Sequence, residues 1–305
     1  MKRSMKTLMV IALGLSLVAA ACGDDDGDKA ATAADAPKIT IGAQNFGESA
    51  LLAEVYKQGL EAKGFDVSVQ KLGGFRDLEV KAFDGKTINF APEYAASMLE
   101  FLNSKKGEAS GDVVATVKKL ESYLLAKGLT VVAHSEAVDT NAFVVTKATA
   151  DKYGLKTLSD LAANGEALKL GGPTDCETNA YCIPGLKTKY GVDLKPRFQA
   201  LETGQIVPAL DAGSIDVALL FSTDGRIKAK NYVLLDDDKK MALADNVVPV
   251  MTVALGRNKD LVEAVNAITA TLTTEKLIDM NKRFDVDKED AAVIAKDYLA
   301  AENLD

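Results

Sequence analysis

The stretch KITIGAQNFGESALLAEVYKQGL (38–60) combines two hydrophobic periods in a single run. Its first six residues alternate apolar and polar side chains, as a half-buried strand does. The rest repeats apolar residues at helical spacing and places one face of a helix against a core. The residues of that face are Leu51, Leu52, Val55, Tyr56 and Leu60. A strand followed by a helix that packs back onto it is the repeating unit of an α/β domain.

The same alternation continues from this unit toward the middle of the chain. Further strands are predicted at DVSVQKL (66–72), TINFA (87–91) and LTVVAH (129–134). Helices are predicted around 78–83, from Pro92 to about Asn103, and over 112–126. Pro92 is expected in the first turn of its helix, where its missing N–H costs nothing.

A second strand and helix series follows, and then the pattern changes. The second series has strands at AFVVT (142–146), LKLGG (168–172), PRFQAL (196–201), IDVALLF (215–221) and NYVLL (231–235). Its predicted helices are one at 158–161, one that runs through Leu186 and one at 204–211. One more strand, VVPVMTVAL (247–255), precedes helices at 261–272, 275–284 and 288–300.

Two such groups predict an α/β fold of two lobes, each around its own sheet, with a ligand cleft between them. Lobe I is expected to comprise 38–141 and 246–305, and lobe II 142–245. The chain then crosses between lobes near Asn141 and again near Asn246.

The first 22 residues have the pattern of a bacterial lipoprotein signal. A basic start is followed by an apolar run over 8–18 and by the small residues of Ala19-Ala20-Ala21-Cys22. Residues 1–21 are predicted to be a signal peptide and Cys22 the lipidated residue, with ordinary secretory cleavage as the alternative. The apolar run is too short to span a bilayer. We expect a protein held on the extracytoplasmic face of the cell membrane by a lipid.

Residues 22–37 contain no large apolar side chain and are predicted to form a flexible acidic tether. The whole chain of 305 residues has a net charge of −8. Without the three basic residues of the signal it keeps 33 of its 36 Lys and Arg residues against 44 acidic ones, a net charge of −11. Such acidity disfavours nucleic acid as a partner. We expect a monomer.

Two cysteines remain after Cys22, at positions 176 and 182. Because an exported protein meets an oxidising compartment, Cys176 and Cys182 are predicted to form a disulfide. A redox-active pair is the weaker alternative, since the spacing is not CxxC and neither cysteine has a nearby histidine.

Catalytic motifs are largely missing from the sequence. His134 is the one histidine, and the chain contains no GxSxG, HExxH or P-loop motif. We therefore expect a binding protein and no enzyme, with no cofactor and no metal ion.

Four segments together resemble one family. They are QNFGES (44–49), NFAPEYAAS (89–97), CIPGLKTKYG (182–191) and DVALLFSTDGRI (216–227). In this order they resemble the quaternary-amine substrate-binding proteins of osmoprotectant ABC importers, which take up glycine betaine, choline, carnitine or related solutes. The resemblance implies a type II periplasmic-binding fold whose two lobes close on one ligand. It also implies delivery to a membrane permease driven by a separate cytoplasmic ATPase.

A trimethylammonium group donates no hydrogen bond, so proteins hold it against aromatic faces by cation–π attraction. The resemblance implies that Tyr94 supplies one such ring, with the Ser97 hydroxyl on the same helix face. The other implied ligand-binding residues are Phe143, Phe221, Asn45 and Ser49. The structural alternatives are a half-buried Tyr94, core positions for both phenylalanines, and an Asn45 that only caps a helix.

The chain departs from the family pattern on the strand containing Val248-Pro249-Val250-Met251, where several relatives carry a tyrosine. The chain has no tryptophan either, so Met251 is a candidate for a soft contact with the ligand. These departures leave other functions open. The same lobes could bind an amino acid or polyamine through acidic groups; a secreted enzyme and a surface interaction protein are the further alternatives.

Overall fold

The computed structural model of this protein describes residues 37–165 and 167–305. The predicted signal peptide (1–21), the predicted lipidation site Cys22 and the tether up to residue 36 lie outside the described residues. Within the described ranges, no helix has both the length and the apolar character needed to cross a membrane.

The first sheet has five strands in the order β2-β1-β3-β10-β4. Their bounds are β1 (Ile39–Ala43), β2 (Val67–Lys71), β3 (Phe90–Tyr94), β4 (Leu129–Val131) and β10 (Val247–Thr252). β1 runs parallel to β2 and β3, whereas β10 runs antiparallel to both β3 and β4. A strand from the end of the chain therefore lies between strands from its beginning.

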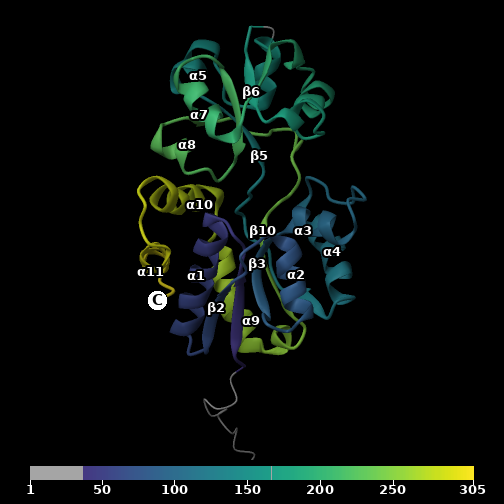
Figure 1. Ribbon diagram of the computed structural model, residues 1–305, viewed down its shortest axis with the longest axis vertical. Helices are drawn as coiled ribbons and strands as arrows, with labels where there is room; N and C mark the ends of the chain where they lie inside the picture. Colours follow the sequence, from purple (N-terminus) through teal and green to yellow (C-terminus); the bar gives the residue numbers. More distant parts are fainter. Residues whose placement is uncertain (1–36, 166) are drawn as a thin grey trace, which may run out of the picture. The chain divides into compact units, whose positions relative to one another are not determined.

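Helices cover both faces of this sheet (Figure 1). α1 (Gly47–Ala62), α9 (Lys259–Thr271) and α11 (Ala291–Ala301) pack with Ile39, Phe90 and Met251 on one face. α2 (Arg76–Asp84), α3 (Ala95–Leu102) and α4 (Val113–Leu125) pack with Ala91 and Val250 on the other. Successive residues of β3 and β10 thus enter different cores, as the two-residue period of a strand requires.

Pro92 corrects one prediction, because it lies inside β3 and the helix begins only at Ala95. The register places Pro92 opposite Pro249 of β10. The N–H of Ala95 donates to the carbonyl of Asn246 at 3.0 Å. Since hydrogen-bonded and non-bonded pairs alternate along an antiparallel ladder, the two prolines occupy a non-bonded pair. Neither missing N–H costs a bond between these strands. On their outer sides, the described pairing of β3 with β1 is at Phe90 and that of β10 with β4 begins at Val250, so neither proline lies opposite a paired residue there.

The second sheet also has five strands, in the order β7-β6-β8-β5-β9. Their bounds are β5 (Asn141–Val145), β6 (Leu170–Gly172), β7 (Phe198–Ala200), β8 (Val217–Phe221) and β9 (Val233–Leu234). The α-helices that accompany it are α5 (Lys147–Tyr153), α6 (Ile183–Gly185), α7 (Thr203–Asp211) and α8 (Arg226–Ala229). The two mixed sheets with their helices confirm the predicted α/β class.

The predicted disulfide is present in the structure between Cys176 and Cys182, whose Cα atoms lie 5.2 Å apart. Both cysteines are fully buried in the core beneath the second sheet, with Leu170 and Leu219 among their neighbours. The bridge therefore ties a short irregular segment to that core.

Two chain segments join the sheets, one before β5 and one before β10. They run side by side, with an antiparallel bridge between Val138 and Asn246. The N–H of Asp139 donates to the carbonyl of Asp245 at 3.1 Å. The predicted crossings near Asn141 and Asn246 and the lobe boundaries at 141 and 246 stay predictions.

Candidate functional site

A cavity of about 1020 Å³ is lined by elements of both sheets. The first sheet and its helices contribute the start of α1, the loop before α2, the end of β3, and the end of α10 (Thr274–Asn281) with the segment after it. The end of β8 and the start of α8 contribute from the second, and the two joining segments complete the wall. The residues that line it are Gln44, Phe46, Gly47, Glu48, Phe75, Arg76, Tyr94, Ser97, Asp139, Phe221, Thr223, Asp224, Arg226, Lys230, Asp245, Asn281, Asp285, Val286 and Lys288.

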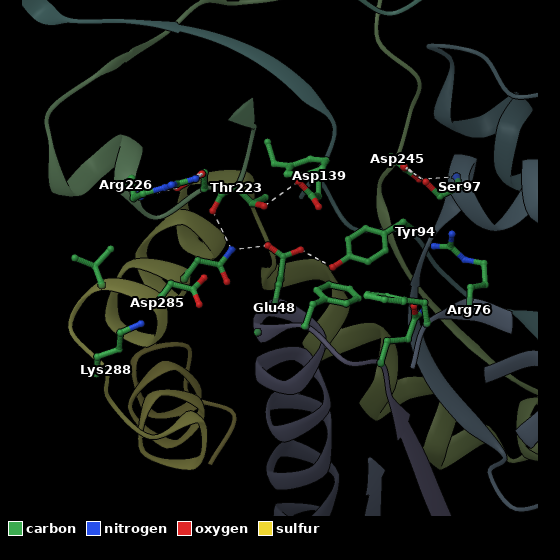
Figure 2. Close-up of a pocket in the computed structure, with 18 of the residues that line it drawn as sticks. Glu48, Arg76, Tyr94, Ser97, Asp139, Thr223, Arg226, Asp245, Asp285 and Lys288 are labelled. Atoms are coloured by element: carbon green, nitrogen blue, oxygen red, sulfur yellow. Dashed lines mark hydrogen bonds and ion pairs between the residues drawn. The ribbon is translucent and has the colours of Figure 1, made fainter. Parts of the chain in front are cut away.

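Glu48, in the first turn of α1, lies at the centre of the cavity wall (Figure 2). Its carboxylate accepts hydrogen bonds from the Tyr94 hydroxyl and from Asn281 Nδ2, each at 2.5 Å. Burial raises the pKa of Glu48, while hydrogen bonds from Tyr94, Thr223 and Asn281 oppose the rise. Burial and the nearby Glu48 charge raise the pKa of Tyr94, so the phenol keeps its proton and acts as the donor.

Two further carboxylates lie on the joining segments. Asp139 accepts a hydrogen bond from Thr223 Oγ1 at 2.9 Å, and burial together with the Glu48 charge raises its pKa to about 8. Asp245 accepts from the Ser97 backbone N–H at 2.8 Å and from the Ser97 hydroxyl. Burial raises the pKa of Asp245 to about 6, although the two bonds from Ser97 work against the shift.

Arg76 also lines the cavity, but its guanidinium is held by Glu93. Arg76 Nε and Nη2 each donate to a different oxygen of Glu93 at 2.7 Å. Burial by itself lowers the pKa of Arg76, and the Glu93 charge outweighs this and raises it. Gln44 Nε2 donates to Glu93 at 2.8 Å and to Glu79 at 2.9 Å, which extends the network behind the wall.

Four aromatic rings face the cavity: Phe46, Phe75, Tyr94 and Phe221. The rings of Phe46 and Tyr94 have centroids 6.2 Å apart and planes inclined by 35°. Phe75 and Phe221 are 60% and 59% exposed, which is unusual for phenylalanine. Exposed aromatic faces beside carboxylates offer both attractions that an organic cation uses.

Three of the predicted ligand residues line this cavity, namely Tyr94, Ser97 and Phe221. Phe143 does not: it is 1% exposed and packs in the core of the second sheet. Ser49 is buried, and its hydroxyl accepts the Gln44 N–H at 2.9 Å. Asn45 is exposed beside the cavity without lining it.

The structure also gives the positions of Asn45 as a possible helix cap and of Met251 as a possible ligand contact. The N-cap of α1 is Phe46, and no side chain caps that helix, so Asn45 does not serve as its cap. Met251, the candidate for a soft ligand contact, is fully buried in the core beside α1 and does not line the cavity.

The acidic residues of the cavity were not predicted from the sequence. With 44 acidic residues in the chain, no spacing distinguishes Glu48, Asp139 or Asp245 from surface carboxylates. Phe46 falls inside the QNFGES segment, and Phe75 follows two glycines at the start of α2. Their sequence signal was therefore an aromatic residue next to a turn, which alone is weak.

Residues 37–301 match the family OpuAC, described as the substrate-binding domain of ABC-type glycine betaine transport systems. A carnitine transport binding protein, OpuCC, of Listeria monocytogenes is 30% identical over 173 residues. That alignment covers 54% of this chain and 54% of the relative, so the chain matches about half of its length.

A glycine-betaine-binding protein of Pseudomonas aeruginosa is 23% identical over 286 residues, which cover 90% of this chain and 91% of that protein. A solved structure described as a glycine betaine/carnitine/choline ABC transporter superposes with a TM-score of 0.78 at 25% identity. It covers 88% of this chain and 99% of its own. The predicted periplasmic-binding fold of two lobes is thereby confirmed.

Proposed function

This chain belongs to the OpuAC family of substrate-binding domains of ABC-type glycine betaine transport systems, and we propose that it captures a small quaternary-ammonium solute. It is a binding protein and not an enzyme. The capture is proposed to occur on the extracytoplasmic face of the membrane, with a lipid on Cys22 holding the body near its permease. The permease and its ATPase are separate chains.

The observation that carries the proposal is the pairing of aromatic faces with carboxylates around one cavity. A quaternary ammonium has no N–H to donate, so it is held by ring faces and by opposite charge at contact distance. Tyr94 and Phe221 come from the first and second sheet respectively. A ligand between them would contact both rings at once.

Closure of the two lobes is part of the proposal. The two joining segments around Asp139 and Asp245 would serve as the hinge, with lobe boundaries at 141 and 246. A solute that contacts rings of both lobes binds the closed arrangement better than the open one, and this difference in affinity is what drives closure. The closed form is then the one delivered to the permease.

The test is a calorimetric titration of the full chain with glycine betaine, choline and carnitine, set against arginine and putrescine. We expect heat of binding from at least one quaternary-ammonium compound. Tyr94→Leu is expected to abolish that heat. Phe90→Leu is the matched control, because Phe90 lies on the same face of β3, is fully buried and does not line the cavity.

A second candidate is an amino acid or polyamine, and the three carboxylates favour it. Carboxylate oxygens accept the N–H donors that arginine and putrescine carry and betaine lacks. Binding of these two compounds alone would overturn the quaternary-ammonium proposal. Retention of choline or betaine binding by Tyr94→Leu would contradict the role assigned to the ring.

A further inference from the structure

The basic side chains of the cavity are mostly committed to carboxylates of the protein itself. Arg76 is bound by Glu93, and Arg226 donates to Asp224 from both Nε and Nη2. Lys230 pairs with an acid outside the cavity, Asp211, at 2.6 Å. The remaining lysine, Lys288, is exposed near Asp285 at the edge. Apart from Lys288 at the edge, a carboxylate on the ligand would therefore meet cations that already have acidic partners.

We call the carboxylates of Glu48, Asp139 and Asp245 the inner carboxylates; their partners differ from those of the basic side chains. Among the described residues, neither Glu48 nor Asp139 nor Asp245 forms an ion pair with a lysine or arginine. Their hydrogen-bond donors are hydroxyl, amide and backbone N–H groups. Buried carboxylates usually have a cationic partner, because an uncompensated buried charge is costly. The cavity itself is where such a cation can enter.

Asn281 adds an independent observation on the same wall. Its side chain is 4% exposed, and its Nδ2 donates to Glu48 Oε2 at 2.5 Å and to the Thr223 carbonyl at 2.9 Å. Because both partners are acceptors, the amide orientation is fixed with the nitrogen toward them. Within the part of the chain that the structure describes, Asn281 Oδ1 is buried with no hydrogen-bond partner. A buried acceptor of this kind lacks a donor, which a ligand hydroxyl can supply.

Building on the proposed function, we infer that the cavity selects a quaternary ammonium that has net positive charge and carries a hydroxyl group, as choline does, over zwitterions. The positive charge would lie against Glu48 and Asp139 and the rings, and the hydroxyl would donate to Asn281 Oδ1. Glycine betaine satisfies neither condition: its own carboxylate repels the inner acids and it has no donor. Carnitine supplies the hydroxyl and still brings the carboxylate.

The test is a calorimetric series on the full chain with four ligands of similar size. Choline has both features; its methyl ether lacks the donor; 3,3-dimethylbutan-1-ol is the uncharged isostere; glycine betaine carries the carboxylate. We expect choline to bind about tenfold or more tightly than glycine betaine, a difference of about 1.4 kcal/mol. The methyl ether is expected to bind several-fold more weakly than choline, and the neutral alcohol more weakly still.

Variants assign the preference to residues. Glu48→Gln combined with Asp139→Asn is expected to bring the choline and glycine betaine affinities together. Glu54→Gln on the same helix is the control, since Glu54 does not line the cavity. Glycine betaine binding as tightly as choline would overturn this inference and leave the proposed function standing. Failure of every quaternary ammonium, with arginine or putrescine binding, would overturn the proposed function as well.

Discussion

Glu93 and Glu48 are both buried carboxylates beside Tyr94, yet their surroundings differ. Glu93 is 0% exposed and is held by the Arg76 guanidinium and the Gln44 amide on the α2 side of β3. Glu48 is 6% exposed, and on the α1 side it is hydrogen-bonded by uncharged groups of Tyr94, Asn281 and Thr223. The first acid is already compensated by the protein, whereas the second is positioned for a charge from outside. A complete set of partners therefore distinguishes a structural acid from one available to a ligand.

The largest expected effect comes from removing the cation of the compensated acid. Arg76→Met leaves Glu93 buried without its partner, and the free energy of unfolding should fall by about 3 kcal/mol or more. Urea denaturation followed by circular dichroism measures the loss. The double variant with Glu93→Gln removes both charges and is expected to recover much of it. A loss below about 1 kcal/mol for the single change would contradict the assignment of Glu93 as a structural acid.

Replacement of Glu48, the acid on the α1 side of β3, should affect ligand binding and not stability. Glu48→Gln keeps an oxygen that accepts a hydrogen bond and removes a buried charge that has no cation. Its free energy of unfolding should change by less than about 1 kcal/mol, while choline affinity should fall about tenfold. Parallel denaturation and titration of the same preparation check this. A large loss of stability would instead place Glu48 in the same class as Glu93.

The comparison also predicts a dependence of cation binding on pH. Asp139 faces Glu48 of α1, Tyr94 of β3, Asp245 of the other joining segment and the Asp224–Arg226 pair after β8. Its pKa of about 8 means that the empty cavity carries a proton there at neutral pH. A cation favours the ionised form, so choline affinity should rise between pH 6.5 and 8.5, with protons released on binding.

The raised pKa of Asp139 also affects the folding stability of the protein without ligand. Asp139 holds its proton in the folded state up to about pH 8, while the unfolded chain releases it near pH 4. The folded state thus binds more protons between these values, and its stability should fall as pH rises through that window. Calorimetric titrations in buffers of different ionisation enthalpy measure the protons released on choline binding. Asp139→Asn should flatten the pH profile of choline affinity and that of folding stability. A choline affinity independent of pH in the original chain would contradict this account.

The smallest expected effect concerns the exposed ring of Phe221. Phe221→Ala removes one cation–π contact, worth about 0.5–1 kcal/mol at an exposed site, so affinity should fall about two- to fivefold. Stability should hardly change. Phe101→Ala is the control, because Phe101 is 43% exposed on α3 and does not line the cavity. Equal effects of the two changes would show that the Phe221 ring does not contact the ligand.

The sequence predicts the α/β architecture well because strand and helix periods are local signals. KITIGA and IDVALLF become β1 and β8, and VVPVMTVAL becomes the strand that returns to the first sheet. Pro92 was misplaced because its tolerance depends on the residue opposite, Pro249, which lies far away in the sequence. α5 was not predicted, since Ala150 is its only buried residue and provides no apolar face.

The site was predictable only where a residue falls in a segment that resembles the family. Tyr94 and Phe221 are implied by the family resemblance and line the cavity, whereas Phe143, implied in the same way, is buried in the core. Asp139 and Asp245 are ordinary acids in the sequence and gain their significance from burial and from facing each other across two segments. Asn281 is brought to the wall from the far end of the chain. Such convergence is a property of the tertiary structure.

The placement of two acids on the joining segments has a mechanical consequence. The backbones of Asp139 and Asp245 are hydrogen-bonded to each other, so under the proposed lobe closure the segments that turn would also carry two of the cavity's carboxylates. Twisting these segments would move the carboxylates away from a bound cation. In the proposed delivery to a permease, separation of the lobes would thus weaken the electrostatic attraction at the ligand.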